Sequence, residues 1–189
     1  MTTKRGRPKT DHGISLDVIL AMALEMLEHT GPQGFSMRAL ATRLKITPMA
    51  IYHYFSSRDA LMRELSDAVY SEVVRDFESA QGDAKAKIKH LLTSYYKIGL
   101  KHPNLTITVF LTPEAFSAEA KRITGFLREL LEATQLSPKR KQMWLDILID
   151  FTHGSFIATA LAGRSNVAFA NKQSLAYVRQ LEELLDQIF

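Results

Sequence analysis

Hydrophobic residues recur three and four positions apart along most of this chain, which is the spacing of one face of an α-helix. Between Ser36 and Arg58 the spacing predicts two helices joined by a three-residue turn, with Ile51 and Phe55 facing the core. Thr47 is placed to cap the second helix and Pro48 to open it, where the missing N–H of proline is harmless. These are the dimensions of a helix-turn-helix.

The same spacing predicts helices through the rest of the chain, separated by breaks at Gly, Pro and polar residues. No segment has the alternation of a strand, so the predicted fold is all-α. The helix at 138–162 is apolar nearly all round, which indicates burial on several sides. The helix at 58–80 is the only candidate connection between the helix-turn-helix and the C-terminal two thirds of the chain. The predicted helices outside the motif cover residues 15–30, 58–80, 84–101, a short stretch ending at 111, 116–134, 138–162 and 172–188, with a loop at 163–170.

The composition narrows the class of protein. The chain has 189 residues and no cysteine, which excludes a disulfide framework and thiol chemistry. The N-terminus has no apolar run typical of a signal peptide, and no apolar stretch is expected to reach the length of a membrane span. We therefore expect a soluble, cytoplasmic protein that does not bind a membrane. No Gly-rich phosphate loop, Gly-x-Ser-x-Gly or His-Glu-x-x-His motif is present, so no enzymatic activity is expected.

Positive charge is concentrated at the N-terminus. Lys4, Arg5, Arg7 and Lys9 give the first ten residues a charge of +4, which equals the net charge of the whole chain. The run at 4–8 resembles the Arg-Gly-Arg-Pro core of the AT-hook, a minor-groove reader. Narrow A·T minor grooves attract inserted arginine, so Arg5 and Arg7 are predicted DNA contacts. The alternative is a non-specific basic tail.

The segment from Leu40 to Leu61 resembles the DNA-binding core of the tetracycline-repressor (TetR) family, and the resemblance extends over about residues 14–65. Three positions depart from the family pattern. Tyr54 stands where His is common, Arg58 replaces Lys, and Lys45 stands where the turn usually has Gly. A left-handed Lys costs about 1 kcal/mol relative to Gly. The matching positions are Leu40-Ala41, Thr47, the run Ile51-Tyr52-His53-Tyr54-Phe55, Arg58 and Ala60-Leu61.

The resemblance implies a three-helix head with the helix-turn-helix, on an α-helical ligand-binding and dimerisation domain. The implied divisions are a basic arm at 1–13, a DNA-binding domain at 14–60 and a ligand and dimer domain at 61–189. The implied partners are a double-stranded DNA operator, a small-molecule effector and a second copy of the chain. The implied function is repression relieved by a small apolar molecule. An activator, or a regulator with a protein effector, would share this head; a small-molecule hydrolase is the remote alternative.

Several head residues are therefore expected to contact DNA. Arg38 is placed to bond a guanine edge or a phosphate, and Met49 and Ala50 to meet a thymine methyl. Tyr52, Tyr54 and Arg58 are expected to position phosphates. The full set of predicted DNA-binding residues is Arg5, Arg7, Ser36, Arg38, Thr47, Pro48, Met49, Ala50, Tyr52, His53, Tyr54 and Arg58.

The effector site is predicted among aromatic and Met residues of the remaining two thirds, although most such residues are core. Asp150 and His153 are three apart on one helix and could share a metal, but two ligands without a third are weak, and polar groups of a pocket or interface are the preferred interpretation. No metal and no cofactor are expected, and the histidines that chelate metal for tetracycline are not evident. The predicted ligand-binding residues are Tyr95, Phe110, Phe116, Phe126, Met143, Trp144, Asp150, Phe151 and His153.

Overall fold

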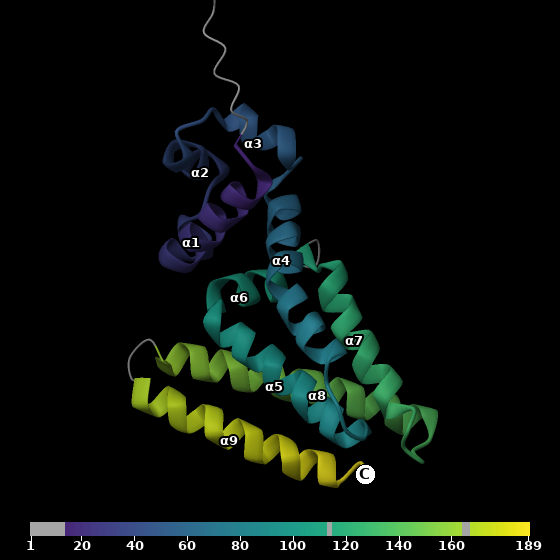
Figure 1. The fold of residues 1–189 in the computed structure, drawn as a ribbon. Helices are drawn as coiled ribbons and strands as arrows, with labels where there is room; N and C mark the ends of the chain where they lie inside the picture. The colour runs from purple at the N-terminus through teal and green to yellow at the C-terminus, as the bar shows by residue number, and fades with distance from the viewer. Residues whose placement is uncertain (1–13, 113–114, 164–166) are drawn as a thin grey trace, which may run out of the picture.

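The computed structural model describes residues 14–112, 115–163 and 167–189, and these form nine α-helices and no strand (Figure 1). The prediction of an all-α fold is confirmed. The first three helices form a head at one end of α4, and the other helices form a body around its far end. The helices are α1 (Leu16–Gly34), α2 (Met37–Leu44), α3 (Pro48–Tyr54), α4 (Arg58–Glu78), α5 (Ala84–Lys101), α6 (Pro103–Leu111), α7 (Ala118–Leu131), α8 (Pro138–Gly163) and α9 (Val167–Asp186).

Local sequence fixes both ends of the helices of the head. The Ser15 hydroxyl accepts from the N–H of Val18 at the start of α1. Gly31 has φ 72° and ψ 172°, so the regular helix stops at Thr30, as the sequence predicts, and a short turn completes α1. Lys45 ends α2 with φ 56° and ψ 37°, the left-handed conformation for which glycine is favoured. The head therefore keeps the turn geometry of a helix-turn-helix without its usual glycine.

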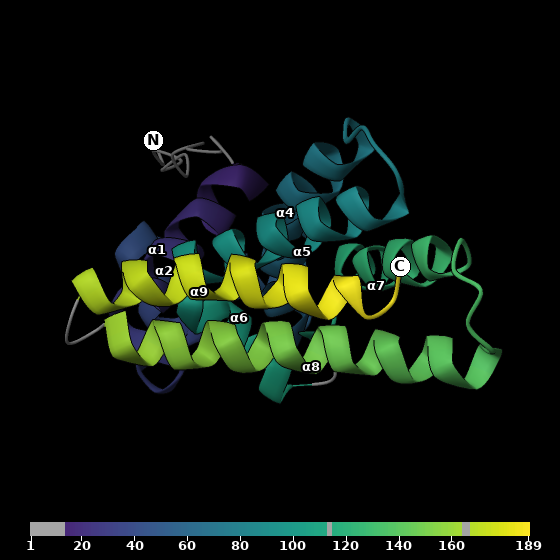
Figure 2. The same cartoon turned by 90° about the horizontal axis from the view of Figure 1, so that it is seen from below.

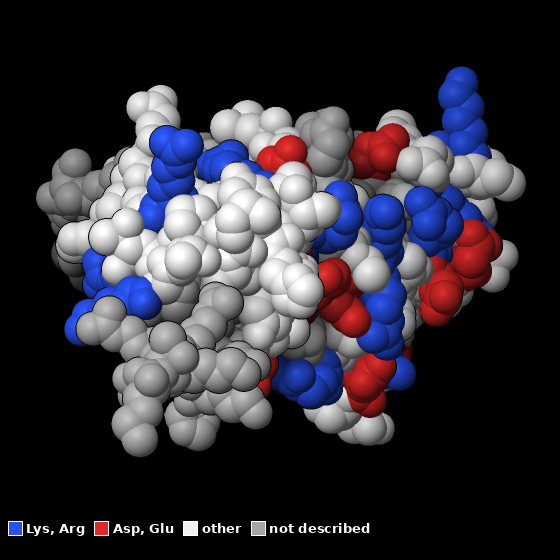
Figure 3. All heavy atoms as spheres, turned by 90° about the horizontal axis from the view of Figure 1, so that it is seen from above, with Lys and Arg blue, Asp and Glu red and all other residues white. Residues whose placement is uncertain are grey.

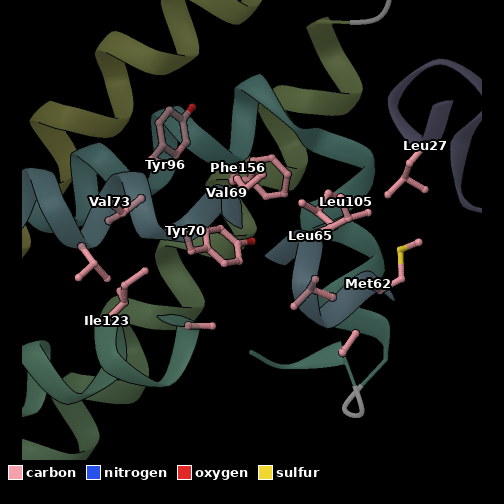
Figure 4. Packing of buried hydrophobic residues seen from close by; sticks show 14 of the residues in the cluster. Leu27, Met62, Leu65, Val69, Tyr70, Val73, Tyr96, Leu105, Ile123 and Phe156 are labelled. Atoms are coloured by element: carbon pink, nitrogen blue, oxygen red, sulfur yellow. The ribbon is translucent and has the colours of Figure 1, made fainter. Parts of the chain in front are cut away.

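Head and body share one hydrophobic core along α4. Figure 4 shows Leu27 of the head at the Met62 end of α4, and Leu105 and Phe156 of the body between Met62 and Val73, and all five belong to one buried cluster. Buried contact of this kind makes α4 a rigid connection rather than a flexible linker.

A second connection joins head and body, so the prediction that the 58–80 helix alone connects them is wrong. The Glu28 carboxylate of α1 accepts hydrogen bonds from the backbone N–H groups of Asn104 (3.0 Å) and Leu105 (2.9 Å). The Asn104 side-chain amide donates back to the Glu28 carbonyl at 2.9 Å. A helix N-terminus carries unpaired N–H groups and partial positive charge, so a carboxylate is well matched to it. Glu28 thus holds α6 of the body against α1 of the head.

The body is built around α5, with α8 and α9 side by side along its underside (Figure 2). The rings of Tyr96 and Tyr177 stack with centroids 3.9 Å apart. Their hydroxyls bond Thr159 (2.8 Å) and Thr152 (3.0 Å) of α8. Gly99 of α5 lets the helices close, because a Cβ there would lie 3.0 Å from the Phe156 ring. Pairing the buried hydroxyls avoids the cost of unbonded polar groups.

Two predicted boundaries in the body are wrong. Helix α7 begins at Ala118 rather than at 116, because the Ser117 hydroxyl accepts from the N–H of Ala120 and caps it. Helix α9 begins at Val167, inside the predicted loop at 163–170. Ser165 and Asn166 stand directly before that start, and both residue types are favoured at a helix N-terminus, so the sequence carried a start signal that the predicted loop overlooked.

The expectation that no apolar stretch reaches the length of a membrane span is wrong for helix α8. Residues Pro138–Ala162 are long and apolar enough to cross a membrane, with a mean hydropathy of 1.3 over their most apolar window. Length and composition do not separate a membrane span from a helix in a protein interface. The packing of α8 against α5, α7 and α9 favours the second interpretation. Only 28% of that window is buried within the described residues of this one chain, so the predicted burial on several sides is not met by the chain's own helices.

Candidate DNA-binding surface and body cavity

The recognition helix α3 divides its residues between core and surface. Ile51 and the following Phe55 are buried, as predicted, and fix α3 on the head. Met49 is 74% exposed, Tyr52 44% and Tyr54 43%, with His53 also at the surface. The predicted base and phosphate contacts on α3 therefore lie on the outer face of the head, while Ala50 is half-buried beneath them.

Two of the predicted DNA contacts serve as helix caps. The Ser36 hydroxyl accepts from the N–H of Ala39 (3.1 Å), and the Thr47 hydroxyl accepts from the N–H of Ala50 (3.3 Å). Caps of this type stabilise a helix by about 1 kcal/mol. Both hydroxyls remain exposed at the start of a helix, where backbone N–H groups also favour phosphate.

Tyr54 and Arg58 are held by contacts inside the head. The Tyr54 hydroxyl donates to the carbonyl of Ile14 (2.7 Å), which ties the end of α3 to the residues before α1. The Arg58 guanidinium donates to the carbonyl of Pro32 (3.0 Å) and lies over the Phe35 ring. These bonds give both side chains a structural role in the free protein, beside the predicted contact with phosphate.

One surface cation was missed by the sequence interpretation, which assigned Lys45 only to the turn. Its left-handed backbone exposes the side chain directly before α3, and no bonding partner for its ammonium is found among the described residues. Arg38 of α2 is exposed in the same way. By contrast, Arg43 is tied to Glu25 at 2.6 Å. Lys45 is thus a further candidate for phosphate contact, signalled in the sequence only by its place in the turn.

Figure 3 looks down on the head end of the molecule. The surface over the head is mostly uncharged, with Lys and Arg at its margins, whereas acidic and basic side chains are mixed on the side where Figure 1 places α7. The head alone therefore offers little positive charge to DNA. The predicted contacts Arg5 and Arg7 lie outside the described residues.

A cavity of about 710 Å³ opens in the body between α5, α6, α7 and α8. This volume falls in the range of pockets for drug-sized ligands. Its wall includes five of the nine predicted ligand-binding residues: Tyr95, Phe110, Phe116, Asp150 and His153. The wall residues that sequence reasoning missed are Leu92, Val109, Ala120, Lys121, Ile123, Thr124, Leu127, Arg128, Ile149 and Thr152.

Four predicted ligand-binding residues lie elsewhere. Phe126 packs on Phe77, with ring centroids 4.6 Å apart, and Phe151 stacks on Tyr177 at 5.4 Å. Met143 is 44% exposed on the outside of α8, and Trp144 is half-buried near it. Helical periodicity identifies these residues as inward-facing or apolar but does not say which neighbour they meet.

A hydrogen-bonded pair supplies the polar group inside the apolar wall. The Tyr95 hydroxyl and His153 Nε2 are 2.9 Å apart, and the Phe110 ring lies 5.1 Å from the imidazole. Burial lowers the pKa of His153, against the opposing charge of Asp150, and raises the pKa of Tyr95 well above its ordinary value. Both groups are therefore neutral near pH 7. His153 Nδ1 is buried without a bonding partner in the described structure.

A metal at Asp150 and His153 would require a third protein ligand. Among the described residues no three His, Cys, Asp or Glu side chains come together in a way that could hold a metal ion. The two residues instead share the rim and wall of the cavity.

Comparisons with known proteins give the same assignment for the head. The family model for bacterial regulatory proteins of the tetR family matches residues 19–65. The chain is 27% identical over 160 residues to an uncharacterized HTH-type transcriptional regulator from Xanthobacter autotrophicus, covering 76% of this chain and 78% of that protein. It is 36% identical over 59 residues to the class E tetracycline repressor protein of Escherichia coli, covering 31% of this chain and 28% of the repressor.

Solved structures match over the head and the body together. A TetR variant from Acinetobacter baumannii AYE in complex with minocycline superimposes with a TM-score of 0.73, covering 92% of this chain and 96% of that one. The two sequences are 21% identical, so this likeness concerns the fold. With the helix-turn-helix geometry and the family match, it leads to one assignment: residues 19–65 form the DNA-binding domain of the tetR family of bacterial regulatory proteins, the whole chain has the fold of a TetR, and the protein is a DNA-binding transcriptional regulator.

Proposed function

We propose that the chain is a homodimeric repressor that occupies a near-palindromic operator and leaves it when a small, mainly apolar molecule enters the body cavity. The observation that carries this proposal is that the helices around the cavity are bonded to the helix that holds the head. Ser66 of α4 donates to Ser117, the cap of α7, at 3.0 Å, and Tyr70 of α4 donates to Thr106 of α6 at 3.2 Å. All four side chains are buried, so a ligand that displaces α6 or α7 acts on α4.

The Glu28 contact gives the ligand a second route to the head. Val109 and Phe110 of α6 border the cavity, while Asn104 and Leu105 at the other end of this short helix hold Glu28. A ligand shifts the balance between two head positions only by its difference in affinity for them. A coupling of about 1–3 kcal/mol would lower operator affinity about 5–150-fold, and operator DNA would weaken ligand binding by the same factor.

The outer face of α8 supports the proposed homodimer. Met143, Gly154, Ala158 and Leu161 are exposed along one side of α8, and Leu175 of α9 is 68% exposed beside them. Asp150 is exposed on the same side of α8, between Met143 and Gly154, so the apolar part of this face lies mainly from Gly154 to Leu161. Exposed apolar residues that gather on one face are typical of protein interfaces. The small side chain of Ala158 and the open space around Gly154 would allow a partner helix to approach closely. A second copy of the chain would bury this face of both.

In this proposal each head places α3 in the major groove. Arg38 and His53 contact base edges, and Met49 meets a thymine methyl, whereas Tyr52 and Lys45 contact phosphates. The two half-sites lie about one helical turn apart or slightly more, roughly 34–36 Å or beyond. The N-terminal arm adds the positive charge that the head surface lacks.

Selection of binding sequences from random duplex DNA tests the operator part of the proposal. We expect near-palindromic sites, a dimer in solution and an affinity that falls steeply with salt. Removing residues 1–10 should weaken binding, flatten the salt dependence and reduce the preference for A·T flanks. A monomer without duplex affinity would contradict the proposal.

A reporter driven by the selected operator tests the direction of regulation. Repression predicts that deleting the protein raises expression; a fall would identify an activator. Thr124→Trp tests the ligand part, because this half-buried residue borders the cavity and the indole would take up space that a ligand needs. The variant should bind the operator normally and ignore every molecule that releases the unmodified protein.

A further inference from the structure

The mouth of the cavity carries two cations that no described carboxylate neutralises. Lys121 and Arg128 border the cavity from α7 and are exposed, and no carboxylate among the described residues pairs with either. They lie seven positions apart with Thr124 between them, so all three share one stripe of the helix. This stripe presents two positive charges beside an apolar hollow.

The neighbouring Arg122, unlike Lys121 and Arg128, is paired with carboxylates. Its guanidinium bonds Glu78 at 2.8 Å and Glu119 at 3.1 Å, so both nearby carboxylates are already committed. The side of α7 that faces α4 is thus charge-paired, whereas the side that faces the cavity is left positive.

The remaining charge at the cavity limits what it can hold. Asp150 borders it from α8 but forms no ion pair with Lys121 or Arg128 in the described structure. With His153 neutral, two cations less one carboxylate leave a single positive charge in excess. A neutral ligand would gain no attraction from that charge, and a cationic ligand would be repelled by it. A monoanion balances it.

The rest of the wall requires an apolar body. Phe110 is 54% exposed and Phe116 40%, and both rings border the cavity, where a ligand would cover them. Ile149 and Leu127 complete the apolar surface between α8 and α7. Guanidinium and carboxylate groups match in a two-point geometry that an ammonium does not offer, which suits Arg128 to a carboxylate.

We infer that, given the proposed ligand response, the effector is a drug-sized carboxylic acid whose apolar body fills the cavity and whose carboxylate lies between Lys121 and Arg128. The acid enters as its anion and keeps the charged end at the mouth. Its apolar end lies against the aromatic rings, beside the hydrogen-bonded Tyr95–His153 pair in the wall. Asp150 opposes the carboxylate and sets a limit on the affinity.

Matched probes test this inference on the full-length dimer. Two sets suffice: pyrenebutyric acid with pyrenebutanol and pyrenebutylamine, and decanoic acid with decanol and decylamine. Within each set the apolar body is constant and only the end group changes. Titration calorimetry, with pyrene fluorescence as a second readout, should rank the acid first, the alcohol second and the amine last. The Thr124→Trp variant should bind none of them if the site is the cavity.

Substitutions then assign the charge. Lys121→Gln and Arg128→Gln should each weaken acid binding by at least about threefold and leave alcohol binding unchanged, since partly exposed charge pairs contribute modestly. Asp150→Asn should have the opposite effect and strengthen acid binding. Lys139→Gln and Arg140→Gln are the matched controls, because both cations are exposed at the start of α8 and do not border the cavity.

The outcomes separate this inference from the proposed function. An alcohol or amine that binds as tightly as its matched acid overturns the carboxylate assignment and leaves a ligand-responsive cavity in place. Acid binding that is insensitive to Lys121→Gln and Arg128→Gln overturns it as well. If no probe of either set binds, both the assignment and the proposed response to a small apolar molecule fail.

Discussion

In the head, Ile19, Leu40 and Ile51 are completely buried within a core closed by short helices, whereas in the body Ile149 and Phe110 border a hollow of about 710 Å³. Both regions are helical and both bury aliphatic residues. The head uses its core to hold α3 at a fixed angle, and the body leaves part of its core volume open. The difference is consistent with the proposed function, in which the head recognises a DNA surface of constant shape and the body accommodates a separate molecule.

The two regions also differ in how their helices begin. Every helix of the head starts at a residue whose own hydroxyl caps it, such as Ser36 for α2 and Thr47 for α3. In the body, α5 and α7 are capped in the same way by Asp83 and Ser117, but α6 has no bond from the side chain of its N-cap residue His102, and Glu28 of the head takes up its N–H groups. The starts of the head helices therefore depend on local sequence, whereas the start of α6 depends on where the head lies.

The largest expected effect is on the free energy of unfolding, and it compares the filled core of the head with the partly open core of the body. Leu40→Ala removes a fully buried side chain of the head and should lower the free energy of unfolding by about 2–5 kcal/mol. Ile149→Ala only widens an existing cavity, so its cost should fall below that range. Thermal and urea unfolding of both variants measure the difference. Equal losses would show that the body cavity is closed in solution.

The next effect tests the contact between the two regions. Glu28→Gln removes the charge that caps α6 and should cost about 1.5–3 kcal/mol, as for other hydrogen bonds to charged groups. It should also reduce the ratio of operator affinities measured without and with ligand. Glu25→Gln is the control, because Glu25 lies on the same helix and pairs only with the exposed Arg43, which is worth at most about 1 kcal/mol. Indistinguishable stability and ligand response in the two variants would remove Glu28 from the coupling.

The surface of the head offers a third test, of sequence recognition against general affinity. Arg38→Ala and His53→Ala should each cost about 1–3 kcal/mol at particular base pairs. Tyr52→Phe should weaken binding to all sequences alike by losing a phosphate contact. Arg43→Ala, on the same helix as Arg38 but paired with Glu25, should keep the preferred site. Binding measured on a panel of single-base operator variants distinguishes these outcomes. An unchanged profile for Arg38→Ala and His53→Ala would mean that α3 does not face the bases.

The smallest effect comes from the polar group inside the body cavity. Burial lowers the pKa of His153, so the unfolded chain binds a proton at a higher pH than the folded protein does. Stability should therefore fall as the pH drops below about 6.5, the ordinary value for histidine. His153→Gln should make the melting temperature less dependent on pH between about 7.5 and 5. His102→Gln, whose less buried ring also has a lowered pKa, should give a smaller change. If the melting temperature of His153→Gln depended more steeply on pH than that of the unmodified protein, the inferred direction of the pKa shift of His153 would be wrong.

The local sequence determined most of the head and the order of helices in the body. Apolar spacing placed Ile51 and Phe55 in the core, and polar residues such as Thr47 marked where helices begin. These features depend on contacts within a few positions, so they can be predicted from neighbours in the chain. The exposure of Met49 and Tyr52 on α3 follows from the same periodicity.

Tertiary structure alone decided which residues meet across the body. Phe116 borders the cavity while Phe126, on the same predicted helix, packs on Phe77, and Glu28 caps a helix that begins 75 positions later in the chain, at Pro103. Periodicity tells which side of a helix turns inward, but it does not tell whether the facing helix lies in contact or leaves a gap. That depends on how four helices fit together at once, and it is also what placed Lys121 and Arg128 at the mouth of a hollow instead of on an ordinary solvated surface.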